Sequence, residues 1–298
     1  MFETKRETRT GVFMTLELKN IGMIKEASVK IDGLTVIAGE NDTGKSTVGK
    51  ELFKEVREYI ICNKISNKLI LDKDEKINLP IFIDTPDLLA KFNYIKNTSV
   101  LLQQNKLNFE LPIEVTDLIL RISQDKVKKR NISEFQLIKN IISGEIFYNP
   151  SKDDIFYKKV IQDKKTIILP MSKTSSGIKM FGYFQMLILN KSIQENTVLI
   201  LDEPEVHLHP KWQLKMAEFI IRLIKINKVK VLVNSHSPYM IEALKRYSEV
   251  EEIEEKTNFY LAEGGYIEHQ DSLENIFEKL TFPLRELKKL KMEKYLND

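Results

Sequence analysis

One stretch of the sequence combines glycines, a lysine and hydroxyl side chains at a spacing that suits phosphate binding. Residues 39–47 fit the pattern G-x-x-x-x-G-K-[ST]. Glycines let the backbone curl so that successive N–H groups face an anion, and a helix N-terminus behind them adds positive potential. Lys45 can then reach β- and γ-phosphates, and the Ser46 hydroxyl can hold Mg²⁺. The predicted phosphate-binding residues are Gly39, Asn41, Asp42, Thr43, Gly44, Lys45, Ser46 and Thr47.

Two carboxylates follow an apolar run further along the chain. Residues 198–201 are Val-Leu-Ile-Leu, and Asp202, Glu203 and a proline come next. A buried strand would carry Asp202 to the carboxyl edge of a parallel sheet, where ligands bind and where it can coordinate Mg²⁺. Glu203 points elsewhere and can act as the base that orients or deprotonates an attacking water.

Two more segments combine a strand or helix end with polar side chains. Residues 174–179 begin a predicted helix, and their hydroxyls and N–H groups can form an anion site to which Lys179 adds charge. Taken alone, this segment is an ordinary Ser/Thr N-cap. Residues 231–238 predict a strand that delivers His236 to its carboxyl end, where the imidazole can hydrogen-bond a γ-phosphate and a water.

The elements around these segments predict an α/β fold. An apolar strand at 34–38 precedes the phosphate loop and a helix at 45–61 follows it. Strands and helices alternate in the last third, which predicts a parallel sheet flanked by helices. Half-buried strands near 16–18 and 27–31 add an N-terminal antiparallel part. The predicted division is an α/β domain of residues 1–61 and 144–298 with a mostly helical lobe inserted at 62–143.

Composition bounds the remaining possibilities. The 298 residues are 42% hydrophobic and 30% charged, which suits a large core and argues against global disorder. The single cysteine, Cys62, excludes an internal disulfide and suits a reducing compartment. We expect no signal peptide in the charged first residues and no membrane span, and therefore a cytoplasmic protein. A net charge of +3 neither requires nor excludes a nucleic-acid partner.

The segment 202–210 makes the resemblance specific. It resembles the Walker B segment and following loop of ABC-type ATPases in the OLD and SMC-like group, and residues 231–238 resemble their switch-histidine segment. In place of their Ser-Gly-Gly signature stand Ser175, Ser176 and Gly177, with serine where the first glycine would be. The resemblance implies ATP and Mg²⁺ as ligands, with Lys45, Glu203 and His236 as catalytic residues and Ser46 and Asp202 as metal ligands. It also implies a head-to-tail homodimer, because each signature contacts the nucleotide of the other subunit.

The same resemblance implies a biological role. OLD nucleases carry a Toprim domain after the switch histidine, and the roughly sixty residues that follow His236 are too few for one. We therefore expect a separate effector protein and, by analogy, an anti-phage defence or toxin–antitoxin system. One alternative is an SMC-like DNA-repair ATPase, and another is a scaffold that binds ATP without hydrolysing it. For the SMC-like alternative, the candidate contacts to DNA phosphates are Lys126, Lys128, Lys129, Arg130, Lys288, Lys289, Lys291 and Lys294.

Several residues are left open. His207 and His209 have the spacing of a metal pair, but no cysteine accompanies them, and packing of the loop at a dimer seam is the favoured interpretation. Gln103 or Gln104 can supply the glutamine that ABC-type ATPases place near Mg²⁺. The segment 82–86, with Asp84, is a second candidate to approach the site.

Overall fold

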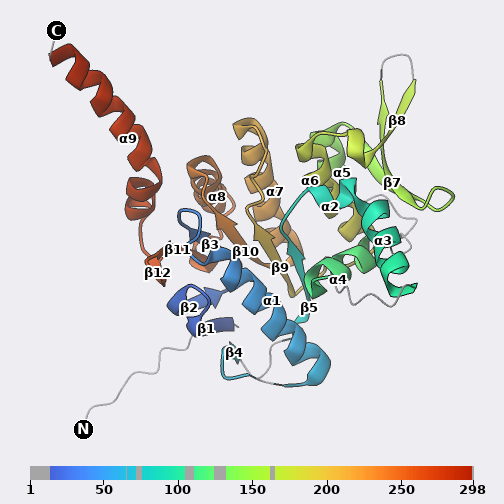
Figure 1. The fold of residues 1–298 in the computed structure, drawn as a ribbon, viewed down its shortest axis with the longest axis horizontal. Helices are drawn as coiled ribbons and strands as arrows, with labels where there is room; N and C mark the ends of the chain where they lie inside the picture. Colours follow the sequence, from blue (N-terminus) through green and yellow to red (C-terminus); the bar gives the residue numbers. More distant parts are fainter. Residues whose placement is uncertain are drawn as a thin grey trace.

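A computed structural model describes residues 14–64, 66–71, 76–104, 111–123, 132–161 and 165–296 (Figure 1). Within these residues, one mixed sheet of nine strands runs in the order β4-β1-β2-β12-β11-β3-β10-β9-β5. Its strands are β1 (Met14–Ile21), β2 (Ile24–Ile31), β3 (Leu34–Ala38), β4 (Leu69–Leu71), β5 (Asn78–Ile83), β9 (Thr197–Asp202), β10 (Lys230–Ser235), β11 (Thr257–Glu263) and β12 (Tyr266–Gln270).

The two halves of this sheet differ in strand direction. Strands β3, β10, β9 and β5 pair parallel with their neighbours, and β11 is parallel to β3. The pairs β4–β1, β1–β2 and β11–β12 are antiparallel, and β12 joins the two halves by pairing parallel with β2. The predicted α/β class, with a parallel centre and an N-terminal antiparallel part, is confirmed. The carboxyl ends of β3, β9 and β10 lie at one edge of the sheet, so the loops after Ala38, Asp202 and Ser235 emerge together.

Both faces of the parallel half are buried, which explains its continuous apolar runs. Along β9, Leu199 and Leu201 pack into one hydrophobic cluster, whereas Val198 and Ile200 pack into the other. Helix α1 (Lys45–Cys62) covers the second face through Val48, Leu52, Phe53 and Val56. Helices α6 (Ser176–Leu189), α7 (Pro210–Asn227) and α8 (Pro238–Val250) cover the first face (Figure 1).

Residues 62–143 contribute to the main sheet as well as to helices. They contain α2 (Asp87–Ala90), α3 (Phe92–Gln104), α4 (Ile113–Ile122) and α5 (Ser133–Ile142), as a helical lobe requires. They also supply β4 and β5 at its two edges. Strand β5 pairs parallel with β9, with Ile83 beside Leu201, and so carries this segment to the carboxyl edge.

A second sheet and a long helix extend from this body. Strands β6 (Glu145–Asn149), β7 (Asp154–Val160) and β8 (Thr166–Pro170) form an antiparallel sheet whose β7–β8 end projects at the upper right of Figure 1. Helix α9 (Glu274–Leu296) begins beside α8 and projects away from the body at the upper left. No helix in the described ranges is long and apolar enough to cross a membrane.

Candidate functional site

The phosphate-binding loop lies between β3 and α1 in a backbone conformation that its glycines make possible. Gly44 has φ +92°, and a Cβ there would meet Ile24 Cγ1 at 2.9 Å. At Gly39, a Cβ would meet the carbonyl oxygen of Ala262 at 2.6 Å. No side chain caps the N-terminus of α1, so the donors of its first turn remain for an anion. Any larger residue at these two positions would therefore collide with neighbouring strands and displace the loop.

Lys45 follows this loop as the first residue of α1 and is buried, with 4% of its surface exposed. Its Nζ donates to the carbonyl oxygens of Gly39, at 2.9 Å, and Glu40, at 2.5 Å. Burial lowers the pKa of the Lys45 ammonium, and the charges of Glu203 and Asp202 oppose that shift. A phosphate oxygen would satisfy this buried cation better than neutral carbonyls do, because charged acceptors form stronger hydrogen bonds. The residues therefore fit a bound nucleotide.

Asp202 ends β9 and is joined to the phosphate loop through the neighbouring strand. The side chain of Asn234 on β10 donates through Nδ2 to Asp202 Oδ1 at 2.8 Å and to the Lys45 carbonyl at 2.9 Å. Asn234 is fully buried, and Asp202 is 9% exposed. One amide thus holds the first residue of α1 and the carboxylate in a common position. A hard cation such as Mg²⁺ suits a carboxylate that is joined to the phosphate loop in this way.

Glu203 and His236 face each other at the same edge. Glu203 adopts φ +51°, a left-handed conformation that is uncommon outside glycine, and its amide donates to the Asn234 carbonyl at 2.9 Å. His236 Nδ1 lies 3.2 Å from Glu203 Oε1. Both side chains are partly exposed, at 41% for His236 and 29% for Glu203, so water and a ligand can reach them. The edge thus brings together the predicted lysine, aspartate, glutamate and histidine.

The signature segment lies apart from this group. Ser175 caps α6 by accepting from the Ile178 amide at 3.5 Å, and Gly177 packs against Trp212, where a Cβ would meet ring atom Cε3 at 2.7 Å. In the described ranges, no hydrogen bond or ion pair joins residues 174–179 to residues 39–47. Lys179 is mostly buried and its Nζ lies 3.5 Å from Asp87 Oδ1, so its charge is already partnered.

The loop after Asp202 contains the two histidines. His207 is exposed and has φ +62°, and His209 caps α7 by accepting from the Lys211 amide at 3.3 Å. Among the described residues, no group of three or more His, Cys, Asp or Glu side chains could hold a metal ion. The His209 side chain thus caps α7, and the His207 side chain is exposed on the loop.

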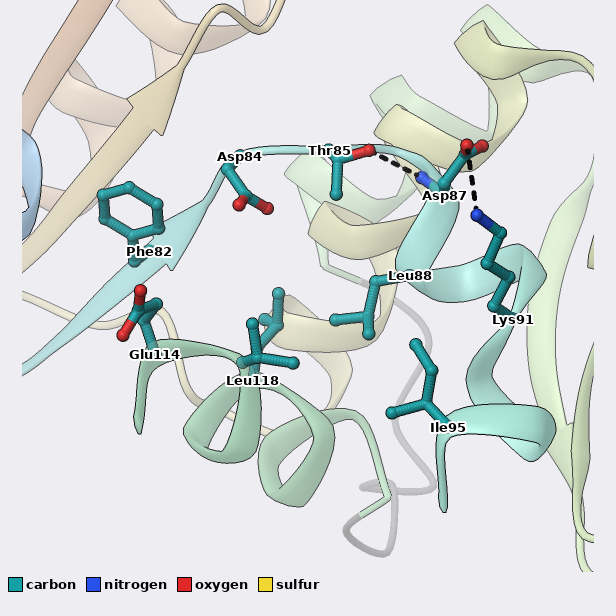
Figure 2. A pocket seen from close by; sticks show the side chains of 10 residues that line it. Phe82, Asp84, Thr85, Asp87, Leu88, Lys91, Ile95, Glu114 and Leu118 are labelled. Carbon is teal, nitrogen blue, oxygen red and sulfur yellow. Dashed lines mark hydrogen bonds and ion pairs between the residues drawn. The ribbon is translucent and has the colours of Figure 1, made fainter. Parts of the chain in front are cut away.

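Asp84 extends the acidic edge by one strand. The register of β5 and β9 places it next to Asp202, and although Asp84 is exposed, desolvation raises the pKa of its carboxyl, with the charge of Asp202 adding to the effect. It lines a cavity of about 270 Å³ with a floor that includes Leu88, Ile95 and Leu118 (Figure 2). The lining of this cavity carries the carboxylates of Asp84, Asp87 and Glu114 against the single ammonium of Lys91, a net negative charge that disfavours a triphosphate.

Some predicted contacts lie outside what the structure describes. Lys126, Lys128, Lys129 and Arg130 fall outside the described residues. The side chains of Gln103 and Gln104 on α3, and of Lys288, Lys289, Lys291 and Lys294 on α9, are also outside the description. Asn234 and Glu205 lie inside the segments 231–238 and 202–210, but residue pattern assigns neither a role, because both act through contacts with distant segments.

Some known proteins are similar to this chain in sequence or in fold. A Septu protein, PtuA, from Bacillus thuringiensis is 27% identical over 112 residues, which are 37% of this chain and only 24% of that relative's length. An Smc head bound to the C-terminal winged-helix domain of ScpA superposes with a TM-score of 0.50 at 13% identity, covering 86% of this chain and 96% of the other. A nucleotide-free ATP-binding cassette of an ABC transporter has a TM-score of 0.48 at 14% identity, with 90% and 96% covered.

The similarity to the Smc head concerns the fold alone, which is that of a P-loop NTPase of the SMC-head type. The AAA ATPase domain family matches residues 90–241, which include the segment of Ser175, the carboxylates after β9 and His236. That match covers just over half of the chain. The chain therefore belongs to the AAA ATPase domain family.

Proposed function

We propose that this protein hydrolyses ATP with Mg²⁺ at two composite sites, each made of the phosphate loop of one chain and the signature of a second. The observation that carries the proposal is the bonded network at the carboxyl edge, which brings Lys45, Asp202, Glu203 and His236 together while residues 174–177 stay apart. Half of an anion site is thus built within each chain. A C2 dimer would supply the other half twice.

Each side chain has a distinct task in this proposal. Lys45 and the amides of residues 39–47 bind the β- and γ-phosphates. Ser46 and Asp202 would hold Mg²⁺, which would supply positive charge against the phosphate oxygens. Glu203 orients a water for in-line attack and takes its proton, and His236, 3.2 Å away, donates toward the γ-phosphate oxygens.

The signature residues complete the site from the other subunit. Ser175 is exposed at the N-terminus of α6, and Ser176 is partly exposed beside it. Their hydroxyls and the helix end are positioned to receive an anion from outside the chain. ATP would favour the closed dimer by its differential affinity for that state, and hydrolysis would reopen it.

The test uses Glu203→Gln, which keeps the shape of the side chain and removes the base. We expect ATP to bring two native chains together in light scattering and phosphate to be released. The variant should dimerise with ATP, stay dimeric and lose turnover by at least about 100-fold. Native chains that bind ATP without associating would contradict the composite site. Equal turnover in both proteins would contradict the role of Glu203, and no turnover in either would favour a scaffold that binds ATP without hydrolysing it.

The biological setting is a further part of the proposal. The motif resemblance favours a prokaryotic anti-phage defence or toxin–antitoxin system in which a separate effector protein responds to the dimer. Protection of a host against phage should then be lost with Glu203→Gln in the intact locus. Binding of duplex DNA that weakens steeply with salt would favour the SMC-like alternative instead.

A further inference from the structure

Glu205 is a buried carboxylate that the proposed chemistry does not use directly. It lies in the loop between β9 and α7, with 3% of its surface exposed. Its Oε1 accepts from the Ser235 hydroxyl at 2.5 Å, the His236 amide at 3.0 Å and the Ser237 amide at 3.2 Å. Three consecutive residues of the switch segment are therefore held by one oxygen from a loop 30 residues away in the chain.

The surroundings of the Glu205 carboxylate make its burial unfavourable. Its other oxygen, Oε2, is buried and has no hydrogen-bond partner in the described part of the protein. Burial raises the pKa of Glu205, and the hydrogen bonds from Ser235 and the His236 amide oppose that shift. A buried acid with one orphaned oxygen is a poor choice for stability alone. A requirement on the position of the switch segment would account for it.

A second side chain joins the same two segments. Gln213 on α7 donates through Nε2 to the Leu208 carbonyl at 3.0 Å, and its Oε1 accepts from the Ser237 hydroxyl at 2.6 Å. The loop of residues 203–209 and the segment of residues 235–237 are thus bridged at both ends. Because both bridges are buried, the two segments are expected to move as one unit.

The outer side of this unit is available to a second chain. His207 is exposed in the middle of the loop, whereas Glu205 and Leu208 on either side are buried. Glu205 holds the His236 backbone through its amide. The imidazole Nδ1 lies 3.9 Å from Glu205 Oε1 and 3.2 Å from Glu203 Oε1. A displacement of the loop at His207 would therefore shift the His236 imidazole through the hydrogen bonds that Glu205 accepts.

We propose that Glu205 is a positioning residue that fixes His236 and couples it to the loop of residues 203–209, so that contact with a second copy of this chain at His207 aligns the histidine for hydrolysis. This inference rests on the proposed function, since it assigns the loop to the subunit seam. The proposal gives Glu205 no contact with the nucleotide or with the attacking water. Its effect is on the turnover step, and binding of ATP through the phosphate loop is independent of it.

The experiment compares Glu205→Gln, Glu205→Ala and Ser235→Ala with the native chain. Glu205→Gln keeps an acceptor oxygen but removes its charge, and Glu205→Ala leaves three buried donors unpaired. We expect kcat to fall about tenfold in Glu205→Gln and about 100-fold in Glu205→Ala, with KM and ATP-binding affinity within about threefold of native. Ser235→Ala removes one donor and should lower kcat the least. Glu195→Gln, a change at an exposed glutamate paired with Lys228, is the matched control and should behave as native.

Hydrogen exchange tests the same inference without a measurement of turnover. In Glu205→Ala, a peptide spanning residues 235–240 should exchange faster, while one spanning 198–202 in β9 should not change. This arm holds even if the native chain hydrolyses no ATP, in which case the proposed function fails and the coupling is judged by exchange alone. Native-like kcat and native-like exchange in Glu205→Ala would overturn the inference. So would a loss of ATP binding that parallels the loss of kcat, because it would make Glu205 a residue of the fold only.

Discussion

Two parts of this molecule carry anion-binding motifs, and they are built in opposite ways. The carboxyl edge of β3, β9 and β10 is knit together across the strands, with Asn234 bonding both to Asp202 and to the Lys45 carbonyl. The start of α6 is satisfied locally: Ser175 caps its own helix, and Gly177 packs on Trp212. The first region is internally connected, whereas the second presents its hydroxyls outward.

The difference teaches which part of the site one chain can form. A network of buried bonds fixes Lys45, Asp202 and Glu203 before any ligand arrives, which is how preorganised sites reduce the reorganisation needed during reaction. The N-terminus of α6 has hydrogen-bond donors, but in the described protomer no hydrogen bond or ion pair joins it to the phosphate loop. A second chain, which brings its own α6, would resolve that asymmetry.

The largest expected effects come from disabling phosphate binding in either region. Lys45→Ala removes the buried cation and should lower turnover by at least about 100-fold, because the phosphates lose their strongest charged donor.

Ser176→Glu should have a similar effect from the other region, since it adds a negative charge where a γ-phosphate is expected. A carboxylate near a helix N-terminus should leave α6 stable. Phosphate release measures both, with Lys54→Ala and Ser172→Glu as exposed controls.

Mixing the two inactive variants sharpens the comparison. A mixed dimer pairs the intact phosphate loop of the Ser176→Glu chain with the intact signature of the Lys45→Ala chain. Random pairing in equal amounts should restore about one quarter of native turnover, since half of the dimers are mixed and each has one intact site. No recovery in the mixture would mean that the two regions do not meet between chains.

A smaller effect is expected from Asn234→Ala, which cuts the bridge within the first region. Asp202 Oδ1 and the Lys45 carbonyl would each lose a donor, so we expect the free energy of unfolding to fall by about 1–3 kcal/mol. Turnover should fall about tenfold as Asp202 and α1 lose their common anchor. Urea unfolding and phosphate release measure the two effects. A change in stability with turnover intact would show that the bridge serves the fold alone.

The smallest expected effect concerns the packing of α6 against α7 in the second region. Gly177→Ala places a methyl group against the Trp212 ring, at 2.7 Å from Cε3 before relaxation, and should cost about 1–3 kcal/mol of stability with ATP binding unchanged. Trp212 is the only tryptophan in the chain, so its emission reports the packing of α6. We expect a shifted emission maximum in the variant. Native-like emission and stability would show that α6 moves freely over α7.

Much of the fold could be predicted because local signals agreed with the tertiary arrangement. The glycines around Lys45, the apolar run before Asp202 and the proline at the start of α7 each mark an element boundary. Strand β5 was harder to predict, because its short apolar run lies in a polar, lysine-rich segment that resembles a helical lobe. Strands β11 and β12 were not predicted, although the glycines at their hairpin turn, Gly264 and Gly265, are a local signal for one.

By itself, the sequence determined the phosphate loop, the acidic end of β9 and the switch histidine, because residue type and spacing within one strand–loop unit are enough to recognise them. Only the tertiary structure decided that Asn234 ties Asp202 to α1, that Glu205 holds the backbone of the switch segment and that Lys179 is partnered by Asp87. These contacts join segments far apart in the chain. They depend on strand register and loop path, which a pattern of residues along the sequence does not encode.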